Sequence, residues 1–342
     1  MKKMTYKFEV AEFFPRRIMD AITDVRVNCP DTVVVSAARR KRRARPTRDG
    51  KLNLLACDHP GRGVTASLDQ PLLMGNRQEY LGRVVRALLC PELDGVMAHT
   101  DVVEDLLILD QLLHESGGLP LLNDRVVAGC MNRGGVHRVA GEIHDRFSSF
   151  TADSLVHLGL DGGKMLLRID NDDERTLKTL GECAQAVTGL SRHNLLAFVE
   201  PLPMKRGEKG YVANYSVSEL VKWVGICAGL GETSRNTWLK IPYVSGFEQV
   251  VLATTLPILL LGGPAHGDPL PTLKECAAGI SCGKNVRGTM VGRNVLFPGD
   301  DDPLSMTAAV AAVIRHGTGP EDAVLAMDQV RNTSMDALAR YL

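Results

Sequence analysis

The side chain with the clearest chemical potential is Lys240, in the middle of the apolar run 237–244. The run is short and bounded by polar residues, which is typical of a buried parallel strand. A charged, unpaired lysine in a core strand is costly, so its amine must be neutral or partnered. A neutral amine is the nucleophile that forms Schiff bases with carbonyl compounds. The alternatives are an amine that reaches solvent at the strand end and one held in an ordinary buried ion pair.

Other polar residues also follow apolar runs: Asp58, His99, Asn123, Asp170, Glu200, Gly262, Gly263, Gly292 and Arg293. Strand alternation groups some of them. Asp58 shares a face with Leu54 and Ala56, Glu200 with Leu196 and Phe198, and Lys240 with Trp238. Lys164, Leu166, Arg168 and Asp170 share one face of another run. If these faces point inward, two lysines and several carboxylates converge. A second ammonium would then lower the pKa of Lys240, and a carboxylate could move protons.

Two glycine-containing turns follow the last two apolar runs. Gly262 and Gly263 end one run, and Gly292 with Arg293 ends the other. Glycines at such ends expose backbone N–H groups to a phosphate, and an arginine adds a charge-assisted hydrogen bond. The alternative is that both are plain tight turns.

The elements that position these residues alternate between strands and helices. From residue 51 onward, eight apolar runs are each followed by a helical pattern; the runs are 53–57, 93–98, 119–122, 164–169, 195–199, 237–244, 257–261 and 287–291. This alternation predicts an α/β fold, a (β/α)8 TIM barrel with its active site at the carboxyl ends of the strands. A doubly wound open sheet is the alternative, although no GxGxxG follows the first strand.

Residues 1–50 differ from the rest and are predicted to form an N-terminal extension to a barrel domain at 51–342. Residues 11–27 have a helical pattern. The basic run 39–45 follows them. It could bind nucleic acid, but a solvated or subunit-contacting segment is the preferred interpretation, because no aromatic residues are interleaved with it. The segment 131–150 is predicted to be irregular.

Composition narrows the function classes. The 342 residues carry 40 basic and 40 acidic side chains, so charge does not indicate binding to nucleic acid or to an anionic membrane. No apolar run is long enough to span a membrane, and the N-terminus lacks an apolar signal core. The eight cysteines are scattered without a CxxC pair, which favours a reducing cytoplasm. The nine histidines form no HxH or HxxxH pair, so no metal site is expected.

Six stretches together resemble the Schiff-base (class I) aldolases that act on fructose and tagatose bisphosphates, sulfosugar phosphates and deoxyribose phosphate. They lie in order between residues 50 and 317: LACDHPGRG at 55–63, KMLLRID at 164–170, FVEP at 198–201, LKIPY at 239–243, LGGP at 261–264 and VGRN at 291–294. His59 and Pro60 depart from the sugar-phosphate enzymes, and Arg168 stands where some relatives carry an aromatic residue. The resemblance extends to aldolase-like proteins associated with inositol catabolism.

The resemblance implies a lyase that needs neither cofactor nor metal. Lys240 would form the Schiff base, Glu200 would transfer protons, and Lys164 and Asp58 would support them. Gly262, Gly263, Gly292, Arg293, Asp170 and Arg168 would bind substrate or phosphate. The substrate would be a phosphorylated sugar or sugar acid, such as a phosphorylated deoxy-ketogluconate. We also expect a homo-oligomer that binds neither nucleic acid nor membrane.

Other functions stay open from the sequence. A barrel isomerase or epimerase could use Glu200 and Asp58 as acid and base, with Lys240 acting only through its charge. A non-catalytic barrel could bind a sugar phosphate. A nucleic-acid-associated protein could use residues 39–48, and a metal-dependent aldolase could use some of the histidines.

Overall fold

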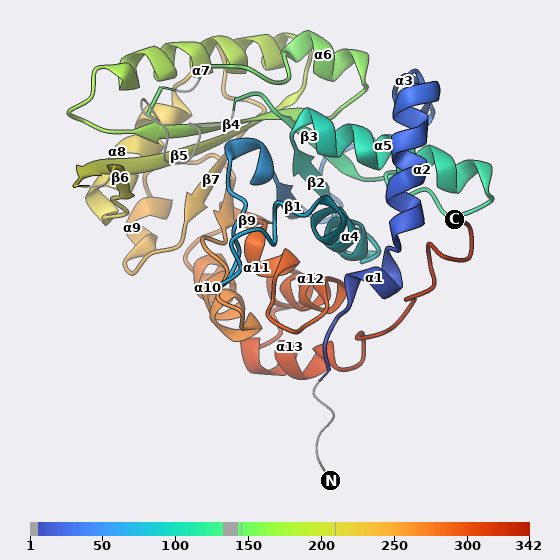
Figure 1. Ribbon diagram of the computed structural model, residues 1–342. Helices are drawn as coiled ribbons and strands as arrows, with labels where there is room; N and C mark the ends of the chain where they lie inside the picture. Colours follow the sequence, from blue (N-terminus) through green and yellow to red (C-terminus); the bar gives the residue numbers. More distant parts are fainter. Residues whose placement is uncertain (1–5, 133–142, 145, 209) are drawn as a thin grey trace.

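The strands of this protein close into a parallel barrel. The computed structural model describes residues 6–132, 143–144, 146–208 and 210–342. Eight strands pair in parallel in the order β1, β2, β3, β4, β5, β7, β8, β9, and the pairing of β9 with β1 closes the ring. Helices surround the strands (Figure 1). The predicted (β/α)8 TIM barrel is therefore confirmed.

The bounds of the elements are as follows. The strands are β1 Leu52–Cys57, β2 Gly95–Ala98, β3 Val126–Cys130, β4 Gly162–Ile169, β5 Leu196–Gly207, β6 Gly210–Ala213, β7 Thr237–Pro242, β8 Ile258–Leu261 and β9 Val286–Val291. The helices that follow barrel strands are α4 Arg77–Leu88, α5 Thr100–Glu115, α6 Ala152–His157, α7 Arg175–Arg192, α8 Val217–Ala228, α9 Phe247–Val251, α10 Pro269–Ser281, α11 Arg293–Leu296 and α12 Pro303–Ala311. The remaining helices are α1 Val10–Phe13, α2 Arg16–Asn28, α3 Thr32–Arg39, the short η1 Pro60–Arg62 and η2 Ala312–His316, and α13 Pro320–Met327.

Two apolar layers lie on the two faces of the strands. One layer fills the barrel interior and contains the side chains Leu52, Leu54, Ala56, Met97, Val126, Ala128, Cys130, Leu196, Phe198, Leu259 and Met290, with Trp238 packed against them. The other layer lies between strands and helices. Because side chains alternate along a strand, the residues that continue the inner faces of β1, β5 and β7 also point inward. The predicted inward faces of these three strands are thus confirmed.

The third strand does not lie where the sequence predicted it. We expected it at 119–122, but the barrel uses β3, Val126–Cys130. The apolar run at 119–122 instead forms a turn in which the Asp110 carboxylate accepts a hydrogen bond from the backbone N–H of Leu122. Asn123 accordingly lies before β3, and its side-chain oxygen accepts from the backbone N–H of Lys41. Its predicted place at the carboxyl end of a strand was wrong.

A β-hairpin extends one side of the barrel mouth. The fifth strand was expected at 195–199, but β5 continues to Gly207 and pairs with the antiparallel strand β6. Its last residues leave the barrel and become exposed. Most of the predicted irregular segment 131–150, namely 133–142 and 145, lies outside the described residues.

The N-terminal helices pack on the outside of the barrel (Figure 1). The predicted helix at 11–27 is two helices, α1 and α2, that meet at Pro15. The α1 helix packs on α4, and α2 and α3 pack on α5. Proline cannot donate the backbone hydrogen bond that a continuous helix needs, which explains the break.

The basic run is not wholly solvated. Arg39 pairs with Asp110 at 2.6 Å and Arg40 with Asp161 at 3.0 Å. Arg43 pairs with Asp94 at 2.8 Å. Arg39 joins the extension to α5. Arg40 and Arg43 join it to residues at the amino ends of β2, β3 and β4, and both side chains are buried. The solvated interpretation was therefore wrong for these side chains.

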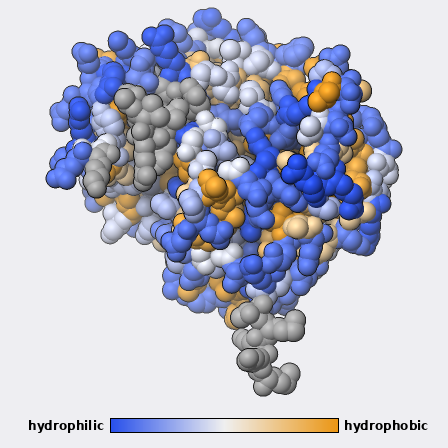
Figure 2. All heavy atoms as spheres, viewed as in Figure 1, coloured by the Kyte–Doolittle hydropathy of each residue, from blue (hydrophilic) through white to orange (hydrophobic). Residues whose placement is uncertain are grey.

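The surface in Figure 2 is mostly hydrophilic, with apolar side chains scattered in small patches. Within the described part of the chain, no helix combines the length and apolar character that crossing a membrane requires.

Candidate active site

Four buried charged side chains form a continuous chain of ion pairs across the barrel interior. The Lys240 ammonium nitrogen lies 3.0 Å from Glu200 Oε1, and Lys164 Nζ lies 2.5 Å from Glu200 Oε2. Lys164 Nζ also lies 2.9 Å from Asp58 Oδ2. The sequence predicted that two lysines and several carboxylates converge, and the structure brings both lysines together with Asp58 and Glu200.

The strands position these groups directly. Lys164, Glu200 and Lys240 lie within β4, β5 and β7, which are neighbours in the barrel. Asp58 follows the last residue of β1. Each side chain continues an inward face, so the apolar layer below holds it in place. Lys164 is fully buried and Lys240 is 6% exposed, so Lys240 does not reach bulk solvent.

Burial and neighbouring charge set the protonation of the two lysines differently. Burial lowers the pKa of Lys240, and the nearby charge of Lys164 acts in the same direction. The Glu200 carboxylate opposes them and raises the pKa of Lys240. Burial also acts to lower the pKa of Lys164, but Asp58 and Glu200 outweigh it and raise that pKa above its usual value. Lys164 therefore stays an ammonium, whereas Lys240 loses its proton more readily than an ordinary lysine.

The two carboxylates remain ionised. Burial alone would raise the pKa of Glu200, but the charges of Lys164 and Lys240 lower it below its usual value. Burial would also raise the pKa of Asp58, but the charges of Arg62 and Lys164 outweigh burial and lower that pKa well below its usual value. Glu200 can consequently accept a proton beside the Lys240 amine near neutral pH.

A cavity of about 360 Å³ opens above this charged chain. Its size is sufficient for a small-molecule ligand. Its walls come from the loops and strand ends at the carboxyl side of the barrel, and the lining includes His59, Arg62, Arg168, Glu200, Tyr215, Lys240, Gly262, Gly263, Gly292 and Arg293. Asp58 and Lys164 do not line it and lie beneath its floor.

The loops after β8 and β9 meet beside the cavity. The Asn294 side chain donates hydrogen bonds to the backbone carbonyls of Gly262 and Pro264, the latter at 2.9 Å. Its oxygen accepts from the backbone N–H of His266 at 2.9 Å. Asn294 therefore fixes the two predicted glycine turns relative to each other, a role that the sequence did not reveal.

Gly292 cannot be replaced without moving the site. A Cβ atom at this position would lie 2.4 Å from the backbone oxygen of Ala56 and 2.6 Å from the ring of His59. The backbone thus approaches the first strand closely, which requires glycine. This approach brings the end of β9 against the end of β1.

Asp170 is the one predicted substrate-binding residue that does not line the cavity. Its carboxylate accepts a hydrogen bond from the backbone N–H of Asp172 at 3.1 Å, and its backbone carbonyl accepts from the Thr176 hydroxyl at 2.7 Å. These bonds shape the turn between β4 and α7. The geometry gives Asp170 a structural role in that turn.

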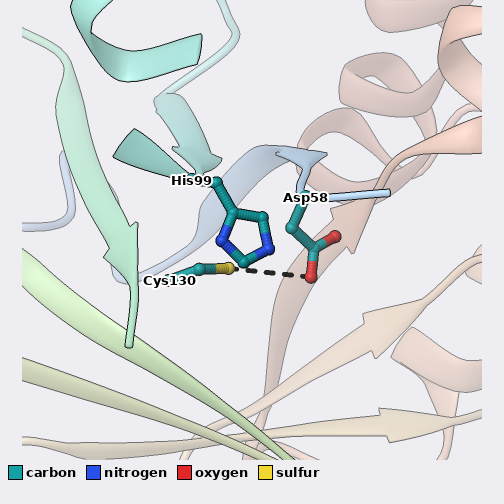
Figure 3. A group of neighbouring side chains, drawn as sticks. All are labelled: Asp58, His99 and Cys130. Atoms are coloured by element: carbon teal, nitrogen blue, oxygen red, sulfur yellow. Dashed lines mark hydrogen bonds between the residues drawn. The ribbon is translucent and has the colours of Figure 1, made fainter. Parts of the chain in front are cut away.

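Asp58, His99 and Cys130 form a further buried group beside the charged chain (Figure 3). Their possible ligand atoms lie within 4.8 Å of one another. However, Asp58 already pairs with Lys164 and with Arg62, the latter at 3.3 Å. Two positive groups at this carboxylate oppose a metal cation, and burial raises the pKa of the Cys130 thiol that would have to ionise. The residues present do not favour a metal here.

Sequence reasoning also missed three cavity residues on loops: His59, Arg62 and Tyr215. His59 and Arg62 lie in the first-strand motif, and their closeness to Asp58 in the sequence was the signal that could have marked them as cavity residues. Tyr215 lies between the hairpin and Ser216, the N-cap residue of α8, and no sequence pattern marked it. Burial lowers the pKa of His59 well below its usual value, so its imidazole is neutral.

Replacing Lys164 with methionine tests how the two lysines are coupled. The substitution removes a positive charge near Lys240 and frees Glu200 to pair with Lys240 more strongly. Both changes raise the pKa of Lys240, so the rising, acidic limb of the kcat/KM profile should move to higher pH. The measurement is a pH–rate series on both proteins, with circular dichroism to verify folding. An unmoved acidic limb in a folded, active variant would show that Lys164 does not tune Lys240.

Comparison with known proteins identifies the family. The model of the Cgl0159-like family matches residues 50–313. The chain belongs to the Cgl0159-like family. The crystal structure of Cgl0159 from Corynebacterium glutamicum is 34% identical in sequence with a TM-score of 0.81, over 88% of this chain and 98% of that one. No curated protein matches the sequence.

More distant solved structures share the fold. An archaeal fructose-1,6-bisphosphate aldolase with its catalytic lysine bound to a carbinolamine intermediate is 21% identical, with a TM-score of 0.56 over 82% of this chain and 99% of that chain. A fructose-bisphosphate aldolase from Slackia heliotrinireducens is 12% identical, with a TM-score of 0.64 over 92% and 94%. The chain thus shares the barrel fold of these structures.

Proposed function

We propose that this member of the Cgl0159-like family is a class I aldolase in which Lys240 forms a Schiff base with a phosphorylated sugar or sugar acid. The observation that carries the proposal is the place of the Lys240 amine. It is buried at a cavity wall, its pKa is lowered, and it contacts an ionised carboxylate. The archaeal aldolase with a carbinolamine on its lysine shares the barrel fold and supports this choice.

The first half of the reaction forms the imine. The neutral Lys240 amine attacks the substrate carbonyl carbon, forming a C–N bond while the carbonyl π electrons move to oxygen. That oxygen takes up a proton from solvent, and Glu200 takes one from the attacking nitrogen, 3.0 Å away. Glu200 then returns its proton to the carbinolamine hydroxyl, which leaves as water. The product is an iminium ion on Lys240.

The second half cleaves the carbon chain. Glu200 removes the proton of the hydroxyl two carbons from the iminium carbon, the C–C bond breaks, and its electrons move to the iminium nitrogen. An aldehyde leaves and an enamine stays on Lys240. Protonation of the enamine carbon and addition of water then release the ketone. Lys164 holds Glu200 ionised and oriented from below the floor, and Asp58 in turn holds Lys164 in place.

The cavity walls support a phosphorylated substrate. The turns at Gly262, Gly263 and Gly292 lie beside Arg293, and all four line the cavity. Backbone N–H groups and a guanidinium are the donors that bind phosphate in barrels of this kind.

The proposal is tested with a panel of phosphorylated ketoses and keto acids. A coupled assay detects the aldehyde product, and borohydride is added to parallel samples. A class I aldolase releases aldehyde from one of these substrates and is irreversibly inactivated only when substrate and borohydride are present together. Turnover that isomerises or epimerises the substrate, with no aldehyde and no reductive inactivation, would support the barrel isomerase instead.

Removal of metal ions should leave the activity unchanged. The iminium nitrogen accepts the electrons of the broken bond, so no Lewis acid is required. The positive charges of Lys164 and Arg62 at Asp58 also oppose a cation at the Asp58–His99–Cys130 group. The enzyme is incubated with EDTA, freed of it by gel filtration and assayed. Loss of turnover that zinc restores would favour the metal-dependent alternative.

A further inference from the structure

The hairpin that extends β5 brings Tyr215 back to the cavity wall. β5 carries Glu200 and then leaves the barrel, β6 returns antiparallel to it, and Tyr215 follows two residues after the end of β6. The backbone N–H of Asn214 donates a hydrogen bond to the Pro203 carbonyl at 2.8 Å, and Ser216 is the N-cap residue of α8. The backbone is therefore held on both sides of Tyr215.

The Tyr215 ring is anchored, while its hydroxyl is left for a bound molecule. The ring packs against the apolar layer between strands and helices, and the residue lines the cavity. Its phenol lies close enough to Glu200 and Arg293 for their charges to act on it. Among the described residues, no group forms a hydrogen bond with the Tyr215 hydroxyl. A phenol in this position can donate a hydrogen bond or a proton to a ligand in the cavity.

One step of the proposed reaction needs an acid that acts on carbon. When the C–C bond breaks, Glu200 has taken the hydroxyl proton, and the enamine on Lys240 still requires a proton on its carbon. The Glu200 carboxyl group lies between two lysine nitrogens, 2.5 Å from Lys164 and 3.0 Å from Lys240. A separate donor on the cavity wall would protonate the carbon while Glu200 keeps both contacts.

The change of charge at Glu200 makes Tyr215 a stronger acid at this stage. Burial and the Glu200 charge raise the pKa of Tyr215 to about 12. The charges of Arg168, Arg293 and Arg62 oppose this rise. The phenol therefore keeps its proton near neutral pH. Bond cleavage protonates Glu200 and so removes one charge that raises the pKa of Tyr215, which then gives up its proton more readily than before.

We propose that Tyr215 is the acid that protonates the enamine carbon. The O–H bond of Tyr215 breaks, the π electrons of the enamine form the new C–H bond, and the nitrogen lone pair forms the iminium ion again. The phenolate then recovers a proton from Glu200, which had taken it from the substrate hydroxyl. One proton has thus moved from that hydroxyl to carbon, and both side chains are restored. The inference rests on the proposed function, because it assigns one step of that reaction.

The test uses Tyr215→Phe, with Tyr211→Phe as the matched control. Tyr211 lies on β6 of the same hairpin, but its hydroxyl donates to Asp173 at 2.6 Å and it does not line the cavity. Each protein is incubated in deuterium oxide with dihydroxyacetone phosphate, which has C–H hydrogens beside its carbonyl, and NMR follows their exchange. The wild type and Tyr211→Phe should exchange these hydrogens, and Tyr215→Phe should do so roughly 10²–10⁴-fold more slowly.

A second measurement separates proton transfer from a structural effect. The panel substrate that the wild type cleaves is mixed with each protein, and the aldehyde is measured by rapid quenching. Because cleavage precedes protonation of the enamine, Tyr215→Phe should release about one equivalent of aldehyde per active site in a fast first turnover and then turn over slowly. Borohydride should still trap the Schiff base in this variant.

Three results would overturn the role of Tyr215. They are exchange at the wild-type rate in Tyr215→Phe, an equal loss of exchange and of the first turnover in that variant, and an equally large loss of exchange in Tyr211→Phe. The last two would show that the hairpin only shapes the site. Absence of both exchange and a borohydride adduct in the wild type would contradict the proposed function instead.

Discussion

Lys240→Met should abolish carbon–carbon bond cleavage while leaving the barrel folded. The thioether cannot attack a carbonyl, so the loss should be on the order of 10⁴–10⁶-fold in kcat/KM, as for other enzymes that lose their nucleophile. Methionine is also apolar and of similar length to the lysine stem. Glu200 keeps its ion pair with Lys164 at 2.5 Å, so the substitution does not strand a buried charge.

The control for this variant is Lys284→Met, at an exposed lysine that precedes β9 and does not line the cavity. It should retain full activity, and circular dichroism should give the same spectrum for both variants and the wild type. Retention of substantial turnover by Lys240→Met would remove this residue from the mechanism and favour a purely electrostatic role.

Glu200→Gln should lower kcat by roughly 10²–10⁴-fold, the range for loss of a general acid–base group. The amide keeps the size of the side chain but cannot shuttle protons between nitrogen and oxygen. The variant should also shift the pH dependence of the rate, and the direction of that shift makes the test specific for Glu200. The Glu200 charge raises the pKa of Lys240, so its removal lowers that pKa and makes the amine more neutral. The acidic limb of the pH profile should therefore move to lower pH even though the rate falls.

Glu208→Gln supplies the matched control, because Glu208 is exposed on the turn of the hairpin. Both variants are compared with the wild type by steady-state kinetics over a pH series. If Glu200 acted only by shifting the pKa of Lys240, the Glu200→Gln variant would regain the wild-type rate at some other pH. Full recovery at any pH would therefore contradict its role in proton transfer.

The residues within strands were predictable, because the alternation of side chains fixes where they point. Phe198 and Glu200 share a face in the sequence, and Trp238 and Lys240 share another; the structure packs the apolar members inside the barrel and the charged ones above them. The carboxyl ends of parallel strands meet at one end of a barrel, so the convergence followed from the fold class.

The loops could not be predicted in the same way, because no period fixes their course. Arg62 and Tyr215 reach the cavity from an irregular turn and from the end of a hairpin. Arg40 pairs with a carboxylate 121 residues further along the chain, and Arg43 pairs with one 51 residues further along. Only the tertiary fold brings the members of these pairs together. Composition alone made these arginines look like a solvated basic run.

The misplaced third strand has a local cause. The run at 119–122 is as apolar as a strand, but it contains Pro120, and its backbone is held by the Asp110 carboxylate at the turn. The true strand, Val126–Cys130, includes Gly129, which weakens its strand pattern. A Cβ at Gly129 would lie 2.4 Å from the ring of Phe150, so the glycine is required by packing that the local sequence does not record.

The most direct test of the central claim is to identify the residue that borohydride modifies in the presence of substrate. The wild-type protein is incubated with the active ketose or keto-acid phosphate, reduced, digested and analysed by mass spectrometry. We expect one stable adduct, with the mass of the reduced substrate, on the peptide that contains Lys240, and none in Lys240→Met. An adduct on a different lysine that persists in Lys240→Met would contradict the account.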